Sequence, residues 1–278
     1  KLVMSFAYIY LYKAINNIAN GEKFKDNIDS FILLVMYIVL ILFQGTRSPF
    51  INLFIFGFLA SYVKYMQLRC WRSRRISGWK YLRTAIYIGI IAIPAFFILG
   101  EYILGRRTGN ALWQYVSEYI AGGIHHFDQY VKDPIQANEH FGEETLVYLY
   151  QGLYKLGLTD FTRTAYLEYR WTNSFIHGNI YTFFRRPLQD FGILGMYIFT
   201  VLICFIFSSF YYKKVRNIQP TLKNDARIFM IIYIYNPLVY VPMESSGFSN
   251  LVSLGNLALY FFLYIAFRAV FSLKIQFK

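Results

Sequence analysis

Long apolar runs alternate with short polar stretches along most of the chain. Runs long enough to cross a membrane, or nearly so, are residues 30–45, 49–68, 84–104, 190–212, 227–243 and 251–272. A transmembrane helix needs about 20 mainly apolar residues, and in lipid a helix satisfies its own backbone hydrogen bonds. The pattern therefore predicts an all-α, polytopic membrane protein that forms a single integral membrane domain over residues 1–278.

The first apolar run, Leu2–Tyr12, is too short to cross a bilayer, and the chain begins with Lys1 rather than Met. We expect it to be a partial span with further helices upstream, rather than a signal peptide. Together with the longer runs it predicts about seven spans. Thr46 and Arg47, just before Pro49, predict a tight turn that joins two of these spans.

The basic residues predict the orientation of the spans. The connection Lys64–Arg83 is rich in Lys and Arg and has no acidic residue, so the positive-inside rule places it in the cytoplasm. Alternation of spans then sends the Arg47 turn and the connection 105–189 to the outer face. Acidic and basic residues are balanced in this connection, and it is too long to be a simple tether. We expect it to be a large extracytoplasmic loop.

Two stretches of this loop predict short interfacial helices. The side chains of Leu146, Leu149, Leu153 and Leu156 recur at helical spacing, which favours a helix lying along the membrane surface. Residues 111–127 mix aromatic and polar side chains, a composition typical of the lipid headgroup region.

Composition and charge exclude several classes of protein. Only 15% of residues are charged, against roughly 25% in soluble domains, so an ordinary cytosolic enzyme is excluded. The formal net charge of +13 could attract nucleic acid, but the long apolar blocks argue against that partner. Cys70 and Cys204 provide neither a disulfide framework nor a thiolate site. His125 and His126 would point about 100° apart on a helix. We therefore predict no metal and no cofactor.

Arginines are predicted at the outer ends of the spans, where topology does not explain them. Arg47 lies in the turn between two spans, Arg106 and Arg107 follow a span, and Arg185 and Arg186 precede one. Guanidinium groups bind phosphate oxygens through two parallel hydrogen bonds and keep their charge at any relevant pH. If these arginines converge, a lipid pyrophosphate in the outer leaflet is the natural ligand. The alternative for each is an arginine that snorkels to the headgroups.

Three residues are candidates for acid–base chemistry. His177 has an ordinary pKa of about 6.5, and Glu118 is a carboxylate in the same loop. Asp190 is expected near the head of a helix, where an N-terminal cap is favoured over catalysis. The sequence has no GxSxG elbow, HExxH motif or nucleotide-binding glycine loop, so no motif supports a hydrolase.

Three stretches resemble the oligosaccharide repeat-unit polymerases of bacterial O-antigen and capsule synthesis. They are LFQGTRSPF at 42–50, YIAGGIHHFDQYV at 119–131 and GNIYTFFRRPLQDFGILG at 178–195. The family pattern is a Gly-Ser/Thr-Arg turn, a long outer loop, and an Asn-x-Tyr-Thr-x-x-Arg run that leads into Asp-Phe-Gly-x-x-Gly and a helix. The resemblance covers about residues 30–210. Members of the family have more spans, so we expect an N-terminally truncated member.

The resemblance implies a glycosyltransferase of the bacterial cytoplasmic (inner) membrane, active on its extracytoplasmic face. Its substrates would be oligosaccharide repeat units on undecaprenyl pyrophosphate, and its partners the bilayer, a chain-length regulator and a flippase of the same pathway. Arg47 and Arg185 match the family's arginines and would contact the pyrophosphate. Because of their location at the outer ends of spans, we also expect Arg186, Arg106 and Arg107 to contact the pyrophosphate. We expect glycan contacts from Asn179, Tyr181 and Thr182.

Other functions stay open. An O-antigen ligase would carry a histidine–asparagine pair in its outer loop, which His177 and Asn179 approach loosely. A flippase or transporter would bury charges along a central path, whereas the predicted spans carry few charges. A scaffolding subunit of other membrane proteins would need only the aromatic richness.

Overall fold

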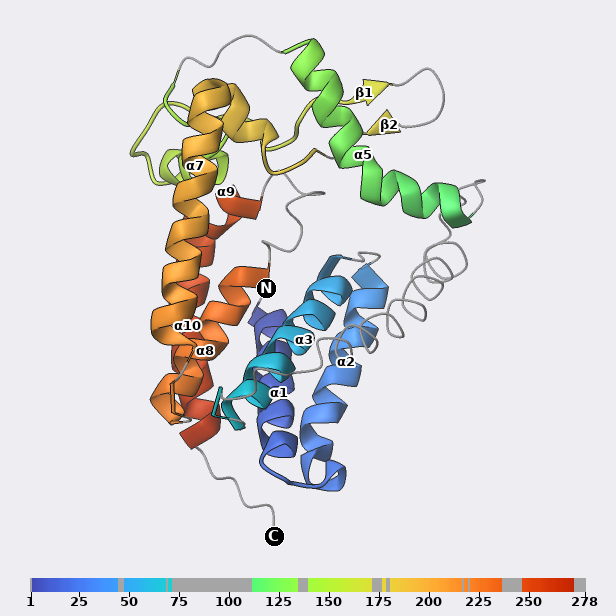
Figure 1. Cartoon of the computed structure of the whole chain (residues 1–278), viewed down its shortest axis with the longest axis vertical. Helices are drawn as coiled ribbons and strands as arrows, with labels where there is room; N and C mark the ends of the chain where they lie inside the picture. The colour runs from blue at the N-terminus through green and yellow to red at the C-terminus, as the bar shows by residue number, and fades with distance from the viewer. Residues whose placement is uncertain are drawn as a thin grey trace. The chain divides into compact units, whose positions relative to one another are not determined.

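A computed structural model of the chain describes residues 2–44, 48–68, 70–71, 112–134, 140–171, 177–178, 181–216, 218–219, 221–236 and 247–272 (Figure 1). The chain divides into two compact units, and each is described by itself. The first contains residues 1–113, 211–233 and 263–278, and the second contains residues 114–210 and 234–262.

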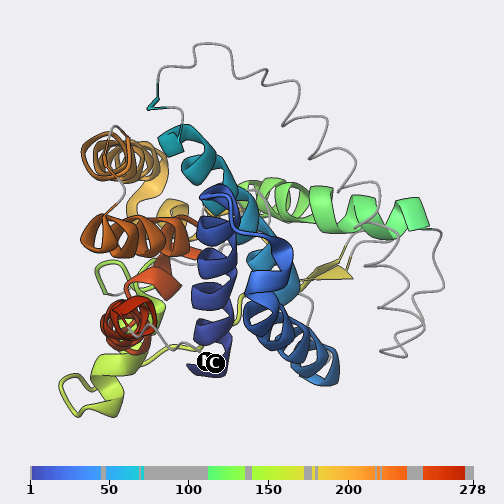
Figure 2. The same cartoon turned by 90° about the horizontal axis from the view of Figure 1, so that it is seen from below.

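In the first unit, helix α1 packs against helices α2 and α3 and lies beside both of them in Figures 1 and 2. The elements here are α1 (Leu2–Ala19), the 3-10 turn η1 (Phe24–Asn27), α2 (Ile28–Gln44), α3 (Ser48–Leu68), most of α8 (Leu222–Tyr235) and the end of α10 (Leu254–Ser272). Aromatic rings form the core. The Tyr12 ring meets those of Phe229 and Phe267 edge-on, with centroids 5.8 and 5.4 Å away.

Helix α1 is longer than its apolar run predicts. The apolar run ends at Tyr12, whereas the helix continues through Lys13 to Ala19. Ala14 is buried on this extension, one heptad after the buried Ala7. Lys13 itself forms a 2.9 Å ion pair with Asp29 at the start of α2, so the lysine links the two helices.

A buried ion pair lies inside this unit. Lys64, expected in a cytoplasmic connection, belongs to α3 and is 4% exposed. Its Nζ lies 2.6 Å from the Asp225 carboxylate in α8, and the Tyr12 hydroxyl donates to the same carboxylate at 3.5 Å. One buried ion pair thus lies among helices whose sequences were expected to carry few charges.

The second unit contains most of the predicted outer loop. Its elements are α5 (Leu112–Lys132), α6 (Val147–Lys155), β1 (Arg170–Trp171), β2 (His177–Gly178) and α9 (Gly247–Leu251), together with most of α7 (Arg185–Lys214) and part of α10 (Leu254–Ser272). Helices α5 and α6 cover residues 112–127 and 147–155 of the two stretches expected to form helices. Their place at a membrane surface stays a prediction. The antiparallel strands β1 and β2, which were not predicted, pair Arg170 with Gly178 and Trp171 with His177.

Three of the described helices are long and apolar enough to cross a membrane. They are Ile51–Leu68 within α3, Arg185–Lys214 and Leu254–Ser272. Helix α2 has 17 residues, and α8 has 14 and begins with several charged side chains. The predicted span at 84–104 and the end of the one at 227–243 lie outside the described residues. The helical class and a membrane protein are thus supported, whereas about seven spans stays a prediction.

Candidate functional site

The middle of the run that carries the family resemblance, residues 181–187, lies in the interior of the second unit. Tyr181 and Arg185 are 0% exposed, Arg186 is 2% exposed and Thr182 is 4% exposed. Helix α7 begins at Arg185, and Pro187 lies in its first turn, where a missing amide hydrogen costs the helix nothing. The chain therefore turns inward at Tyr181 and presents two consecutive arginines at the head of a long apolar helix.

Arg185 is held by a carboxylate, an amide and two aromatic rings. Its Nη2 donates to both oxygens of Glu168, at 3.2 and 3.1 Å, and its Nη1 donates to the side chain of Gln189. The guanidinium carbon lies 3.5 Å from the centroid of Tyr130 and 5.5 Å from that of Tyr181. A guanidinium is thus sandwiched in a mainly aromatic pocket with its charge matched by Glu168.

Arg186 binds a different carboxylate. Its Nη1 donates to the Glu144 side chain at 2.6 Å and to the Glu144 carbonyl at 3.2 Å, and its Nη2 donates to the Ala165 carbonyl at 2.6 Å. Arg163 approaches the same carboxylate at 2.9 Å and also pairs with Glu143. Two neighbouring residues of α7 therefore bind two separate segments of the loop.

Asp190 caps a turn in another segment. Its carboxylate accepts hydrogen bonds from the backbone N–H groups of Glu144 and Thr145, at 3.0 and 2.6 Å, just before α6. The expected cap on its own helix differs from this, because α7 already begins at Arg185 and Asp190 lies beyond its first turn. Both carboxylate oxygens are occupied by backbone amides, so the contacts favour a structural role.

Burial controls the protonation of several groups in this cluster. It raises the pKa of the Glu144 carboxyl, while Arg186 and Arg163 act in the opposite direction. Burial also raises the pKa of the Tyr130 and Tyr181 hydroxyls, so both stay neutral at physiological pH. Among the described residues, the buried Arg185 Nε and Thr182 Oγ1 have no hydrogen-bond partner. These two atoms could bind water or a polar ligand group.

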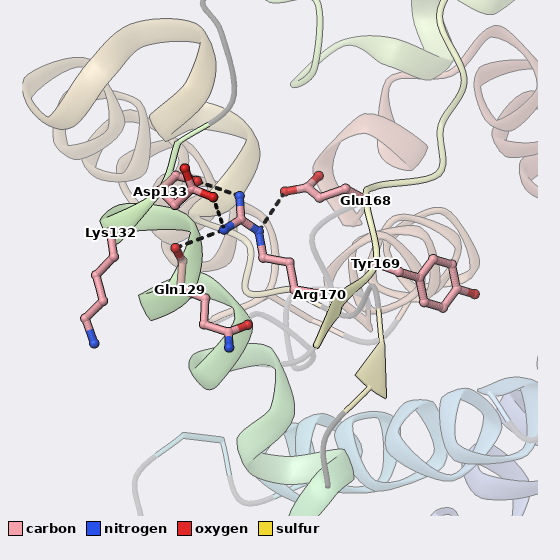
Figure 3. Close-up of a pocket in the computed structure, with 6 residues that line it drawn as sticks. All are labelled: Gln129, Lys132, Asp133, Glu168, Tyr169 and Arg170. Carbon is pink, nitrogen blue, oxygen red and sulfur yellow. Dashed lines mark hydrogen bonds and ion pairs between the residues drawn. The ribbon is translucent and has the colours of Figure 1, made fainter. Parts of the chain in front are cut away.

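An open pocket of about 480 Å³ lies beside the cluster (Figure 3). Arg170 fixes its walls, because its Nη1 donates to the Gln129 carbonyl at 3.1 Å and its Nη2 to the Asp133 carbonyl at 2.5 Å. Its Nε lies 3.5 Å from Glu168 Oε1. The residues that line the pocket are Gln129, Lys132, Asp133, Glu168, Tyr169 and Arg170. Glu168 therefore belongs to both the pocket and the buried cluster.

The structure brings together only part of the predicted site. Tyr181, Thr182, Arg185, Arg186 and Asp190 share one unit, as described above. Glu118 lies in α5 and His177 in β2, but their side chains are outside the described part of the chain. The predicted residues that lie wholly outside the described ranges are Arg47, Arg106, Arg107 and Asn179. Convergence of the three arginine positions stays a prediction.

Sequence reasoning missed the acidic partners, Glu144 and Glu168, and the pocket arginine Arg170. Their contacts with α7 or with α5 span 17 to 42 residues of chain, which no local periodicity can reveal. The even balance of acids and bases in the loop was the one indication of internal ion pairs. Within the described residues, no group of three or more His, Cys, Asp or Glu side chains could hold a metal ion.

Comparisons with protein-family models, curated proteins and solved structures find no match to this chain. The functional argument therefore depends on the residues and on the geometry of the second unit.

Proposed function

We propose that the chain is a membrane glycosyltransferase that polymerises oligosaccharide repeat units carried on a polyprenyl pyrophosphate, at the outer face of a bacterial cytoplasmic membrane. The observation that carries the proposal is the location of the polymerase-like run. Its Tyr181, Arg185 and Arg186 form the charged interior of a folded loop unit. That unit lies at the head of a 30-residue helix apolar enough to cross a membrane.

The reaction in question is a displacement at a sugar carbon. A hydroxyl of the acceptor glycan attacks the anomeric carbon of the donor, forming a new C–O bond. The bond from that carbon to the lipid pyrophosphate breaks, and the pyrophosphate keeps the electron pair. A base takes the hydroxyl proton. Fixed cations near the departing pyrophosphate stabilise its developing charge, which is commonly the largest contribution to such catalysis.

Arg185 and Arg186 act in this scheme as positioning residues. Each is buried and paired with a carboxylate, and breaking a buried pair costs about 3–5 kcal/mol. They hold the loop in shape, while direct contact with the pyrophosphate is assigned to Arg47, Arg106 and Arg107. Because Asp190 is bound by two backbone amides, His177 and Glu118 are the better candidates for the base.

A second candidate function, export of a lipid-linked glycan, is favoured by one observation in the first unit. The Lys64–Asp225 pair is buried among apolar helices, at 4% and 11% side-chain exposure. Ionisable groups inside membrane helices commonly mark transport pathways. A single matched pair also serves as a packing contact, so we place this function second.

Glycan length in a deletion strain separates these functions. Loss of a polymerase leaves single repeat units on the cell surface, loss of a flippase leaves none, and loss of a ligase leaves polymer on the lipid carrier. We expect the deletion to give single repeats, and we expect Arg47→Ala to reproduce this in complementation. Normal chain-length ladders in the deletion strain, or surface glycan lost altogether, would rule out the polymerase.

A further inference from the structure

The pocket beside Arg185 has a balanced set of polar groups. It combines the cations Lys132 and Arg170 with the carboxylates Asp133 and Glu168, and adds an amide and an aromatic ring from Gln129 and Tyr169. A pocket without net charge gives little attraction to an anion such as pyrophosphate. It does offer both donors and acceptors at close range.

The residues of the pocket divide into fixed and accessible groups. Arg170 is only 14% exposed at its side chain and is held by α5 and by Glu168, so it forms a wall. The more exposed side chains are Asp133 at 90%, Lys132 at 72% and Tyr169 at 60%. Asp133 is paired with Arg170 at 3.4 Å and Lys132 with Asp128 at 2.6 Å, and both pairs are open to solvent on one side. In Figure 3 Asp133 lies against the Arg170 guanidinium, while Lys132, at the end of α5, and Tyr169, in the segment before β1, point outward on either side of it.

This arrangement matches a sugar better than a phosphate. Each sugar hydroxyl both donates and accepts hydrogen bonds, so it can pair with a carboxylate and an ammonium in turn. The apolar face of a sugar ring can cover an exposed aromatic ring such as Tyr169. The volume of about 480 Å³ falls within the range of small-molecule sites.

We propose that this pocket binds the saccharide portion of a repeat unit, as a neutral oligosaccharide site distinct from the arginines assigned to pyrophosphate. The inference rests on the proposed function and assigns it a substrate-binding surface. Glu168 connects this pocket with the buried cluster around Arg185, because its carboxylate contacts Arg170 at 3.5 Å and Arg185 at 3.1 Å. A sugar in the pocket is thereby held one side chain away from the polymerase-like run.

The test is a binding titration with the full chain in lipid nanodiscs. The probes are the free repeat-unit oligosaccharide, released from its lipid carrier by mild acid, and inorganic pyrophosphate. We expect Tyr169→Ala and Asp133→Asn to weaken oligosaccharide binding about tenfold each, as loss of one good contact does. The matched controls are Tyr166→Ala, 84% exposed in the same segment, and Asp160→Asn, which is also exposed. Neither lines the pocket, and both should bind like the wild type.

The outcomes separate this inference from the proposed function. Oligosaccharide that fails to bind the wild type, or binds all four variants equally, overturns the saccharide site. Pyrophosphate binding that is lost in Tyr169→Ala overturns it as well, since the pocket would then be an anion site. If the deletion strain makes normal polymer while pocket-dependent oligosaccharide binding persists, the polymerase proposal fails and the saccharide site stands.

Discussion

The guanidinium of Arg185 lies 3.5 Å from the centroid of the Tyr130 ring while its Nη2 holds both oxygens of Glu168. The flat face of the Arg185 guanidinium thus contacts Tyr130 of α5, and its edge binds Glu168 in the segment before β1. A desolvated cation–π contact contributes about 2 kcal/mol, and the paired carboxylate removes the cost of an isolated buried charge. The loop unit is stabilised around this contact.

Replacing Arg185 should destabilise the loop unit. Arg185→Ala removes the cation–π contact and the ion pair with Glu168, while Glu168 keeps Arg170 at 3.5 Å, so we expect a loss of about 3 kcal/mol in the free energy of unfolding. Arg185→Lys keeps the charge but loses the planar fork, so it should lose less. Thermal unfolding in detergent, with protease cleavage between α6 and β1 as a local probe, measures both. Lys155→Ala, at an exposed position of α6, is the control. An Arg185→Ala variant as stable as the control would contradict the buried role.

Asp190→Asn tests whether the carboxylate is a cap or a base. An asparagine oxygen can still accept one of the two amide hydrogen bonds, so we expect a loss of about 0.5–2 kcal/mol, as at other caps. Polymer length should fall only in proportion to the folded protein present. Polymer that disappears while the unfolding temperature is unchanged would assign catalysis to Asp190.

The Lys64–Asp225 pair should matter far more than an exposed pair. Lys64→Ala leaves a buried carboxylate, for an expected cost of about 3–5 kcal/mol. Lys13→Ala removes the exposed pair with Asp29 and should cost about 0.2–1 kcal/mol. Unfolding midpoints in detergent compare the two. The double variant Lys64→Met, Asp225→Leu should recover most of the loss. Failure to recover would show that the ion pair itself, and not only the filling of this space, stabilises the helices.

Gly192 interrupts the regular geometry of helix α7, and a side chain at this position should destabilise the protein. Its φ of +66° lies in the left-handed region, although a Cβ there would meet nothing within 4 Å. Gly192→Ala should therefore cost about 1 kcal/mol from backbone strain alone. Gly255, in ordinary helical conformation with equal space, is the matched control. Gly255→Ala should instead raise the unfolding temperature. Equal effects at both positions would contradict the strained kink.

Stability should fall at alkaline pH because of Tyr181. Burial raises its pKa in the folded protein above the value of about 10 found in unfolded chains. Above pH 10 the unfolded chain loses this proton while the folded protein keeps it, so the free energy of unfolding falls as pH rises. Urea unfolding between pH 9 and 11 should show a smaller fall in Tyr181→Phe than in the wild type. An equal fall in both would assign the effect to other tyrosines.

Local patterns predicted much of the helical structure. The expected spans 49–68 and 251–272 appear as α3 and α10, within three residues at each end, because apolar runs define helices in lipid. Polar residues misled the prediction at helix ends. Lys64 was placed in a connection, yet it lies in α3 and pairs with the Asp225 carboxylate on another helix. Such pairing depends on tertiary contact and leaves no periodic trace.

The sequence correctly singled out Arg185 and Arg186, but it did not predict that they would be buried in ion pairs. The run around Arg185 and Arg186 indicated importance, and both do lie at the centre of the second unit. Exposed phosphate-binding arginines were the expectation, whereas these two are buried with Glu168 and Glu144. Which acid pairs with which base depends on how the loop folds back on α7, and the sequence contains no rule for that choice.

The adjacency of Arg185 and Arg186 limits how this loop can diverge. The exposed turn after α6 can gain or lose residues, since the contacts that hold this loop are made before it, at Glu144, and after it, at Arg163, Ala165 and Glu168. One residue inserted between the two arginines would turn one guanidinium by about 100° around the helix, away from its carboxylate. Related chains should therefore vary freely in the length of the turn after α6 and keep an unbroken arginine dipeptide.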